Sequence, residues 1–213
     1  MAHSLNDRIT ACRACPRLVE WREAVAREKA KRYAEWEYWG RAVPNFGDPA
    51  ADKLIVGLAP AAHGANRTGR MFTGDRSGEW LYRALHRAGI ANQPTFESAD
   101  DGLQLRGVLI TAVCHCAPPD NRPTREEVAQ CQPYLVELLA SREWTSILCL
   151  GGIAWEAVHR VLGIRQECKF GHGAMWQGTP IIRASYHPSQ QNTFTGRLTE
   201  QMFDDVIGQF AAD

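Results

Sequence analysis

The chain lacks an excess of charge of either sign, because 24 lysines and arginines balance 24 aspartates and glutamates. No global positive field therefore attracts a polyanion, and any nucleic-acid surface must be a local concentration of charge. No apolar run approaches the roughly 20 residues that span a bilayer, and residues 1–17 lack the apolar stretch of a secretory signal. We therefore expect a cytoplasmic protein with no membrane partner, and a monomer.

Seven cysteines in a reducing compartment are poor candidates for disulfides, and their odd number fits metal ligands and buried thiols better. Cys12 and Cys15 form a CxxC pair, and Cys116 and Cys131 have 14 residues between them. Four thiolates suit zinc or an iron–sulfur cluster, and spacing does not separate the two. Spacing also leaves Cys114 as a rival to Cys116 and leaves open a redox pair with two buried thiols.

The length of 213 residues and the 45% hydrophobic content predict one domain over residues 1–213. Short apolar runs, which read as buried strands, cover residues 54–58, 108–113, 147–150 and 181–185. Helical patterns cover residues 17–38, 78–88, 125–140, 153–162 and 198–210. This alternation predicts an α/β fold with a parallel sheet covered on both faces. The loops that follow the strands should then meet at one edge of the sheet.

The loop over residues 57–78 is rich in glycine, which permits close approach of the backbone to a ligand. Arg67, Arg70 and Arg76 give it a local positive charge, and Phe72 is either a stacking platform or a core aromatic. The phosphate-binding patterns GxGxxG and GxxxxGK[ST] are both absent from the chain. We therefore do not expect a Rossmann or P-loop enzyme.

Two further loops carry polar residues at the same predicted edge. Three prolines in residues 116–124 stiffen the backbone around Asn121, which suits a preorganised site, although the segment also fits a turn before a helix capped at Thr124. His187 begins a polar run that contains no acid up to Arg197 and suits a phosphate backbone or a base stack. A histidine here is able to donate a hydrogen bond to developing negative charge, or is structural.

An ordered set of motifs resembles the uracil-DNA glycosylase superfamily, and more narrowly its iron–sulfur branch. The motifs are GLAPA (57–61), RMFTGD (70–75), CAPPDNRP (116–123), CQPYL (131–135), LCLGGIA (148–154) and HPS (187–189). Leu58 stands where one type of this branch has a glutamate that helps to activate water. Together with the insertion AAHGANRTGR and the tail NTFTGRL, Leu58 resembles the type-5 uracil-DNA glycosylases.

The resemblance implies a three-layer αβα sandwich with a central four-stranded parallel sheet. It also implies a [4Fe-4S] cluster that joins the N-terminal segment to the domain, with the ligands Cys12, Cys15, Cys116 and Cys131. The implied reaction is hydrolysis of the N-glycosidic bond of a flipped uracil in double-stranded DNA during repair. Phe72 matches the aromatic that stacks on the base, and His187 matches the histidine near the carbonyl of the leaving base.

Leu58 is unable to orient water, so another residue is needed for that role. Asn121 is the preferred group for holding the nucleophilic water, with Asp75 second. The residues assigned to the base pocket, besides Phe72, are Gly57, Ala59, Ala61 and His63. The residues assigned to DNA binding are Arg67, Arg70, Ser189, Gln190, Asn192 and Arg197.

One departure from the iron–sulfur relatives concerns base recognition. Ala112 stands where those relatives usually have an asparagine that reads the edge of uracil. Loss of a base-edge hydrogen bond relaxes discrimination, so we expect activity on other deaminated bases, hypoxanthine first. A cysteine-ligated zinc module that binds nucleic acid without catalysis, and a hydrolase of free nucleotides, are the alternative functions.

Overall fold

The computed structural model describes residues 4–165 and 169–213, so Cys168 lies outside the described residues. The strands are β1 (Phe46–Gly47), β2 (Lys53–Gly57), β3 (Val108–Ala112), β4 (Ser146–Leu150), β5 (Met175–Trp176) and β6 (Ile181–Ser185). They form one sheet in the order β1-β3-β2-β4-β6-β5. The central four strands are parallel, as predicted, and β1 and β5 add an antiparallel strand at each edge.

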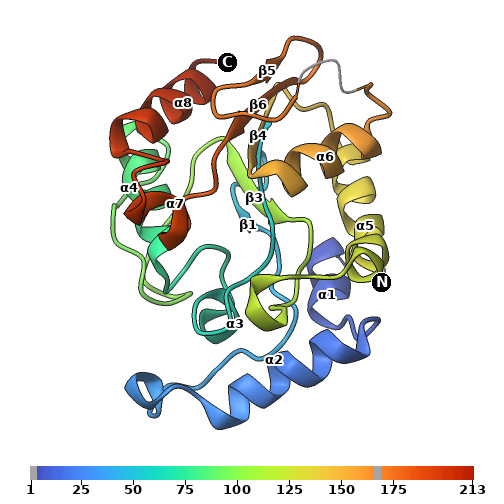
Figure 1. The fold of residues 1–213 in the computed structure, drawn as a ribbon, viewed down its shortest axis with the longest axis vertical. Helices are drawn as coiled ribbons and strands as arrows, with labels where there is room; N and C mark the ends of the chain where they lie inside the picture. Colours follow the sequence, from blue (N-terminus) through green and yellow to red (C-terminus); the bar gives the residue numbers. More distant parts are fainter. Residues whose placement is uncertain (1–3, 166–168) are drawn as a thin grey trace.

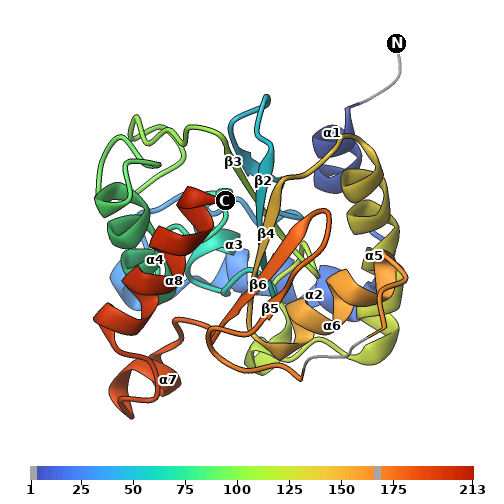
Figure 2. The same cartoon turned by 90° about the horizontal axis from the view of Figure 1, so that it is seen from above.

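Helices cover both faces of this sheet (Figures 1 and 2). They are α1 (Leu5–Thr10), α2 (Pro16–Glu28), α3 (Ala65–Thr68), α4 (Arg76–Arg87), α5 (Arg125–Ala140), α6 (Gly152–Val161), α7 (Gln190–Phe194) and α8 (Glu200–Ala212), with the 3-10 helices η1 (Lys31–Tyr33) and η2 (Pro119–Asn121). Helices α4 and α8 lie on one face, and α5 and α6 lie on the other. The three-layer αβα architecture is therefore confirmed.

The sheet has an apolar core on each face, and the side chains of β4 contribute to both. Successive residues of a strand point to opposite faces, so Leu148 and Leu150 pack toward α4 and α8. Ile147 and Cys149 pack toward α5 and α6 instead. All four are at most 1% exposed, which accounts for the continuous apolar run in the sequence.

The helix predicted over residues 17–38 is wrong in its second half. Helix α2 ends at Glu28, because Lys29 has a φ of 55° and so leaves the right-handed helical region. The Nζ atom of Lys29 donates to the carbonyl of Ala34 at 3.1 Å, which folds the chain back. Trp36 lies outside the helix, and its ring packs against the guanidinium group of Arg67 on α3.

The register of the parallel strands brings their carboxyl ends together. Gly57 at the end of β2 pairs with Ala112 at the end of β3. Leu150 at the end of β4 likewise pairs with Ser185 at the end of β6. The loops that begin after these residues therefore start at one edge of the sheet. Among the described residues, no helix is both long and apolar enough to cross a bilayer.

Candidate active site

The rings of Phe72 and His187 lie together at this edge. Their centroids are 5.9 Å apart and their planes are inclined by 27°, so the rings are stacked. The turn at the end of β2 leaves space for Phe72, because a Cβ on Gly57 would lie 2.8 Å from its Cζ. The predicted stacking aromatic and the predicted histidine thus meet, although they come from different loops.

The backbone of Phe72 is held in an unusual conformation. Its φ is 54°, in the left-handed region that costs a residue with a side chain about 1–3 kcal/mol. The first turn of α4 packs against its carbonyl so closely that a Cβ on Gly78 would lie 1.6 Å from the Phe72 oxygen. This packing holds the backbone from which the Phe72 ring extends.

Asp75 lies beside this turn as the N-cap of α4. Its Oδ1 accepts a hydrogen bond from the backbone N–H of Gly78 at 3.0 Å. Its Oδ2 packs against Gly64, where a Cβ would lie 2.5 Å from that oxygen. Burial raises the pKa of Asp75, while the backbone amides of Gly78 and Ser77 and the charge of Arg67 oppose the rise. The carboxylate is therefore oriented and drawn partly out of water.

His187 is neutral at physiological pH, because burial lowers the pKa of its imidazole to about 4. The first turn of α7 holds its backbone. The Nδ2 atom of Asn192 donates to the carbonyl of His187 at 2.8 Å, and the N–H of Ser189 donates to the same oxygen at 2.8 Å. A neutral imidazole still has one N–H to donate to a ligand.

Asn121 is not brought into this group by any contact among the described residues. It ends η2 with a φ of 55°, and its side chain is exposed. Leu58, the residue after β2, is half-buried and offers no polar atom in its side chain. Asp75 is consequently the better-placed polar side chain beside Phe72.

The other predicted base-pocket residues belong to the loop between β2 and α3. The carbonyl of Ala61 accepts hydrogen bonds from the N–H groups of Gly64 and Asn66, which tightens the turn. His63 shares a hydrogen bond of 3.0 Å with the hydroxyl of Tyr38. Burial and neighbouring arginines lower the pKa of His63. Ala59 packs against the core on the α5 and α6 face.

The predicted DNA contacts of Arg67 and Arg70 do not fit their surroundings. Arg70 is 3% exposed and donates to both carboxylate oxygens of Asp101 at 2.7 Å each. Arg67 is 4% exposed, with its guanidinium carbon 3.9 Å from the ring centroid of Tyr33 and 4.1 Å from that of Trp36. Both cations are stabilised within the protein, so we assign them to the support of the loop.

The predicted DNA residues after His187 remain accessible. Ser189 caps α7 by accepting from the N–H of Asn192 at 3.4 Å, and Gln190 is exposed at the first position of the helix. Arg197 is exposed, and its guanidinium carbon lies 4.4 Å from the ring centroid of Tyr186. These side chains belong to the segment that directly follows His187 in the chain.

Two residues with notable surroundings, one after His187 and one at the cysteine cavity, could not be identified from the sequence. Phe194 at the end of α7 is 68% exposed, and the guanidinium carbon of Arg76 lies 4.5 Å from its ring centroid. A single phenylalanine within the polar run QQNTFTGR was the available signal. The other residue is Arg22 on α2, which is 1% exposed and donates to Cys116 Sγ at the cysteine cavity.

The four cysteines predicted as ligands line one cavity between the N-terminal segment and α5. Hydrogen bonds reach the sulfurs from α2 and from the segment after β3. Arg22 Nη1 donates to Cys116 Sγ at 2.8 Å, and the N–H of His115 donates to Cys131 Sγ at 3.4 Å. Cys114 does not line this cavity and is fully buried in the apolar core on the α5 and α6 face, where its thiol contacts that of Cys131.

The donor set of this cavity fits an iron–sulfur cluster. Tyr134 and His115 border the same cavity, and the four cysteines are the lining residues with sulfur. A [4Fe-4S] cluster takes four cysteine sulfurs, each on a different iron, so the sulfurs surround a cube rather than a point. Four cysteines around one cavity suit that group.

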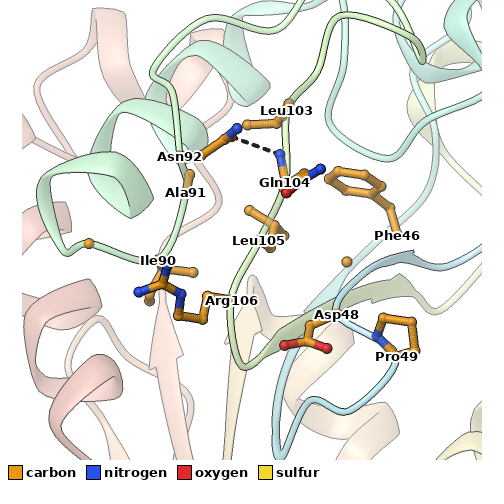
Figure 3. A pocket seen from close by; sticks show the side chains of 12 residues that line it. Phe46, Asp48, Pro49, Ile90, Ala91, Asn92, Leu103, Gln104, Leu105 and Arg106 are labelled. Carbon is orange, nitrogen blue, oxygen red and sulfur yellow. Dashed lines mark hydrogen bonds between the residues drawn. The ribbon is translucent and has the colours of Figure 1, made fainter.

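A second cavity lies at the opposite end of the strands, before β3 and beside the end of α4 (Figure 3). Its wall is stabilised by a hydrogen bond of 2.8 Å from the N–H of Gln104 to Asn92 Oδ1. Of its described lining residues, only Asp48 and Arg106 carry charge, and Asp48 accepts from the N–H groups of Gly107 and Ala50. This cavity therefore lacks the polar cluster found at the carboxyl edge.

Comparison with known proteins agrees with the fold and the site. A family model described as the uracil DNA glycosylase superfamily matches residues 44–211. The chain is 53% identical over 209 residues to a type-5 uracil-DNA glycosylase of Mycobacterium leprae, covering 95% of this chain and 91% of that protein. It is 50% identical over 203 residues to one of Thermus thermophilus, covering 93% and 92% of the two chains. It is 47% identical over 208 residues to a type-5 uracil-DNA glycosylase of Pyrobaculum aerophilum, covering 97% of this chain and 91% of that protein.

The fold, the carboxyl-edge site and these matches define a glycosylase of the uracil-DNA glycosylase superfamily. Within it, the chain belongs to the type-5 uracil-DNA glycosylases. It is accordingly a DNA glycosylase, a hydrolase that acts on N-glycosyl bonds. The alternative prediction of a zinc module without catalysis is wrong.

Proposed function

We propose that this enzyme hydrolyses the N-glycosidic bond of uracil in double-stranded DNA and leaves an abasic site. The observation that carries the proposal is the stacking of Phe72 on His187 at the carboxyl edge of the sheet, with Asp75 capping the helix whose first turn packs against the Phe72 carbonyl. The names of the relatives support the substrate. The target base must leave the duplex to reach this edge, so the enzyme binds it flipped.

In the proposed reaction, Phe72 and His187 act on the base. Phe72 offers a ring face for stacking, and the packing of its backbone against α4 supports it. Cleavage passes through an oxocarbenium-like sugar while negative charge grows on the departing base. The imidazole of His187, with a pKa of about 4, is neutral and donates a hydrogen bond to that charge.

Asp75 acts on the sugar and the water in this proposal. The apolar Leu58 is unable to orient water, whereas the Asp75 carboxylate is fixed by the first turn of α4. It polarises the attacking water or stabilises the sugar cation. This reverses the order predicted from the sequence, which preferred Asn121, because Asn121 is exposed and its side chain makes no hydrogen bond within residues 4–165 and 169–213.

The substrate range follows from the wall beside Phe72. Ala112 is 2% exposed and pairs with Gly57 in the sheet, so it presents no polar group to the edge of a base. We therefore expect cleavage of hypoxanthine in DNA at least about tenfold faster than cleavage of adenine, and slower than cleavage of uracil. Single-turnover assays on duplexes that carry each base measure the three rates, with unmodified duplex as competitor.

The outcomes of this experiment are separable. Equal exclusion of hypoxanthine and adenine would contradict the proposed relaxed recognition but not the action on uracil. Failure of unmodified duplex to compete, together with cleavage of free deoxyuridine, would instead identify a hydrolase of free nucleotides.

The segment after His187 binds the duplex in our proposal. Ser189, Gln190, Asn192 and Arg197 offer donors to phosphates, and the exposed ring of Phe194 fills the space that the flipped base vacates. We expect Phe194→Ala to slow cleavage of uracil in duplex DNA about tenfold, since a stacked aromatic contributes about 1–3 kcal/mol. Single-turnover rates on duplex and single-stranded substrates measure this.

A matched control is Val136→Ala on α5, which also truncates an exposed apolar side chain. It should leave both rates unchanged. On single-stranded DNA no duplex space has to be filled, so Phe194→Ala should be close to the unsubstituted enzyme there. An equal loss on both substrates would contradict the proposed filling of the duplex.

We further propose that Cys12, Cys15, Cys116 and Cys131 hold a [4Fe-4S] cluster. With all four cysteines as ligands, the cluster would offer no open position to a water and would serve as a structural crosslink. It would join the N-terminal segment, including the small core of Ile9 and Leu18, to the rest of the domain. The shared cavity supports this assignment.

A further inference from the structure

Arg22 is a buried arginine whose role is not explained by the proposed reaction. It lies on α2, is 1% exposed, and points its guanidinium group at the cysteine cavity. Nη1 donates to Cys116 Sγ at 2.8 Å, and Nη2 donates to the backbone carbonyl of Cys12 at 3.0 Å. Both contacts are to residues predicted as ligands of the cluster, one to a sulfur and one to a backbone carbonyl.

The charge of Arg22 is not neutralised by a carboxylate. In the part of the chain that the structure describes, no Asp or Glu forms an ion pair with it. Its Nε is also buried without a hydrogen-bond partner. Burying an unpaired cation costs several kcal/mol, so such a group persists where an anion lies close to it. The group that Arg22 faces is the set of cysteine sulfurs.

We infer that Arg22 is the counter-charge of the proposed cluster and a hydrogen-bond donor to its ligand Cys116. This inference rests on the proposed cofactor. A cubane with four cysteine thiolates carries net negative charge, which would neutralise the buried guanidinium. Hydrogen bonds to the sulfurs and nearby charge set the reduction potential of such clusters, and partners of ligands are worth about 10–100-fold in metal affinity.

Arg22 also connects this region to the loop of the active site. The Nδ2 atom of Asn66 on α3 donates to the backbone carbonyl of Arg22 at 3.2 Å. Asn66 follows Gly64, against which the Asp75 carboxylate packs. Arg22 is therefore a positioning residue for the cluster, and α2 is shared between the cluster and the loop that supports Asp75.

The test compares Arg22→Met with Arg27→Met in the holoprotein. Both changes remove an arginine from α2, but Arg27 is exposed and does not face the cavity. We expect Arg22→Met to release iron to a ferrous chelator about tenfold faster than the unsubstituted protein. Its reduction midpoint should move to more negative potential, because the lost positive charge no longer stabilises the reduced cluster. Arg27→Met should change neither quantity.

The outcomes separate the inference from the cofactor on which it rests. Unsubstituted protein without iron–sulfur absorbance would overturn the cofactor. A cluster in that protein, together with an unchanged release rate and midpoint in Arg22→Met, would overturn the role of Arg22 alone. If Arg22→Met does not fold, Arg22→Lys and Arg22→Gln decide, because lysine keeps the charge and glutamine does not. Retention of iron by the Gln variant equal to or better than that by the Lys variant would overturn the inference.

Discussion

Replacing Asp75 by asparagine is expected to lower the single-turnover rate on uracil-containing duplex DNA about 100-fold or more, the typical loss for a positioned electrostatic group. Asparagine is also a good N-cap residue, so α4 and the turn that holds Phe72 should stay in place. A loss of rate without a loss of thermal stability would therefore report the chemistry of the carboxylate. Rapid-quench kinetics and thermal unfolding of the same preparation measure the two quantities.

Two other variants complete this experiment. Asp100→Asn neutralises an exposed carboxylate and should behave as the unsubstituted enzyme. Asn121→Ala tests the order of the two candidates, and we expect a smaller loss than for Asp75→Asn because the Asn121 side chain is exposed. A normal rate for Asp75→Asn beside a slow Asn121→Ala would return the role of positioning water to Asn121.

The pH dependence of the reaction gives a second measure of Asp75. Burial raises the pKa of Asp75, so its carboxylate takes up a proton at higher pH than an exposed aspartate does. The rate should fall as the pH falls through that pKa, and this acid limb should disappear in Asp75→Asn. Arg67→Met removes a positive charge that lowers the pKa of Asp75, so the limb should move to higher pH. His187, with its pKa of about 4, does not titrate near neutrality.

The fold could be predicted from sequence patterns wherever burial follows a regular period. The alternating burial of β4 produces the apolar run ILCL, and the helix expected over residues 125–140 coincides with α5. The helix predicted over residues 17–38 ends before Lys29, whose φ is positive. The aromatic residues beyond Lys29 keep a helical spacing in the sequence, so the pattern does not reveal this end. The edge strands β1 and β5 have two residues each, too few to show any period.

The arginines show why part of the site could not be predicted. A sequence gives the charge of Arg70 but not its partner, and Asp101 comes from a distant loop. Arg67 is likewise covered by Tyr33 and Trp36, which the failed helix prediction had placed elsewhere. In contrast, Phe72 and His187 were expected to share an edge, because the order of parallel strands determines which loops meet.

Replacing Cys116 by alanine is expected to remove most of the bound iron and to lower thermal stability. The loss of a structural metal centre is among the few changes that cost about 4 kcal/mol or more. For a chain of this size, about 4 kcal/mol corresponds to a fall in Tm of roughly 8–16 °C. The small core around Ile9 and Leu18 should loosen, because the cluster would hold the N-terminal segment to α5. Iron analysis, visible absorbance and thermal unfolding measure the effect.

Cys114→Ala is the matched control, two residues away on the same segment. Cys114 is fully buried and does not line the cavity, although its thiol contacts Cys131, so alanine removes a buried thiol but none of the four sulfurs that line the cavity. We expect this variant to keep its iron and to lose no more than about 1–2 kcal/mol of stability. If Cys114→Ala lost the iron while Cys116→Ala kept it, the third ligand would be Cys114. A colourless protein with bound zinc and full stability would show instead that the four sulfurs close around a single ion.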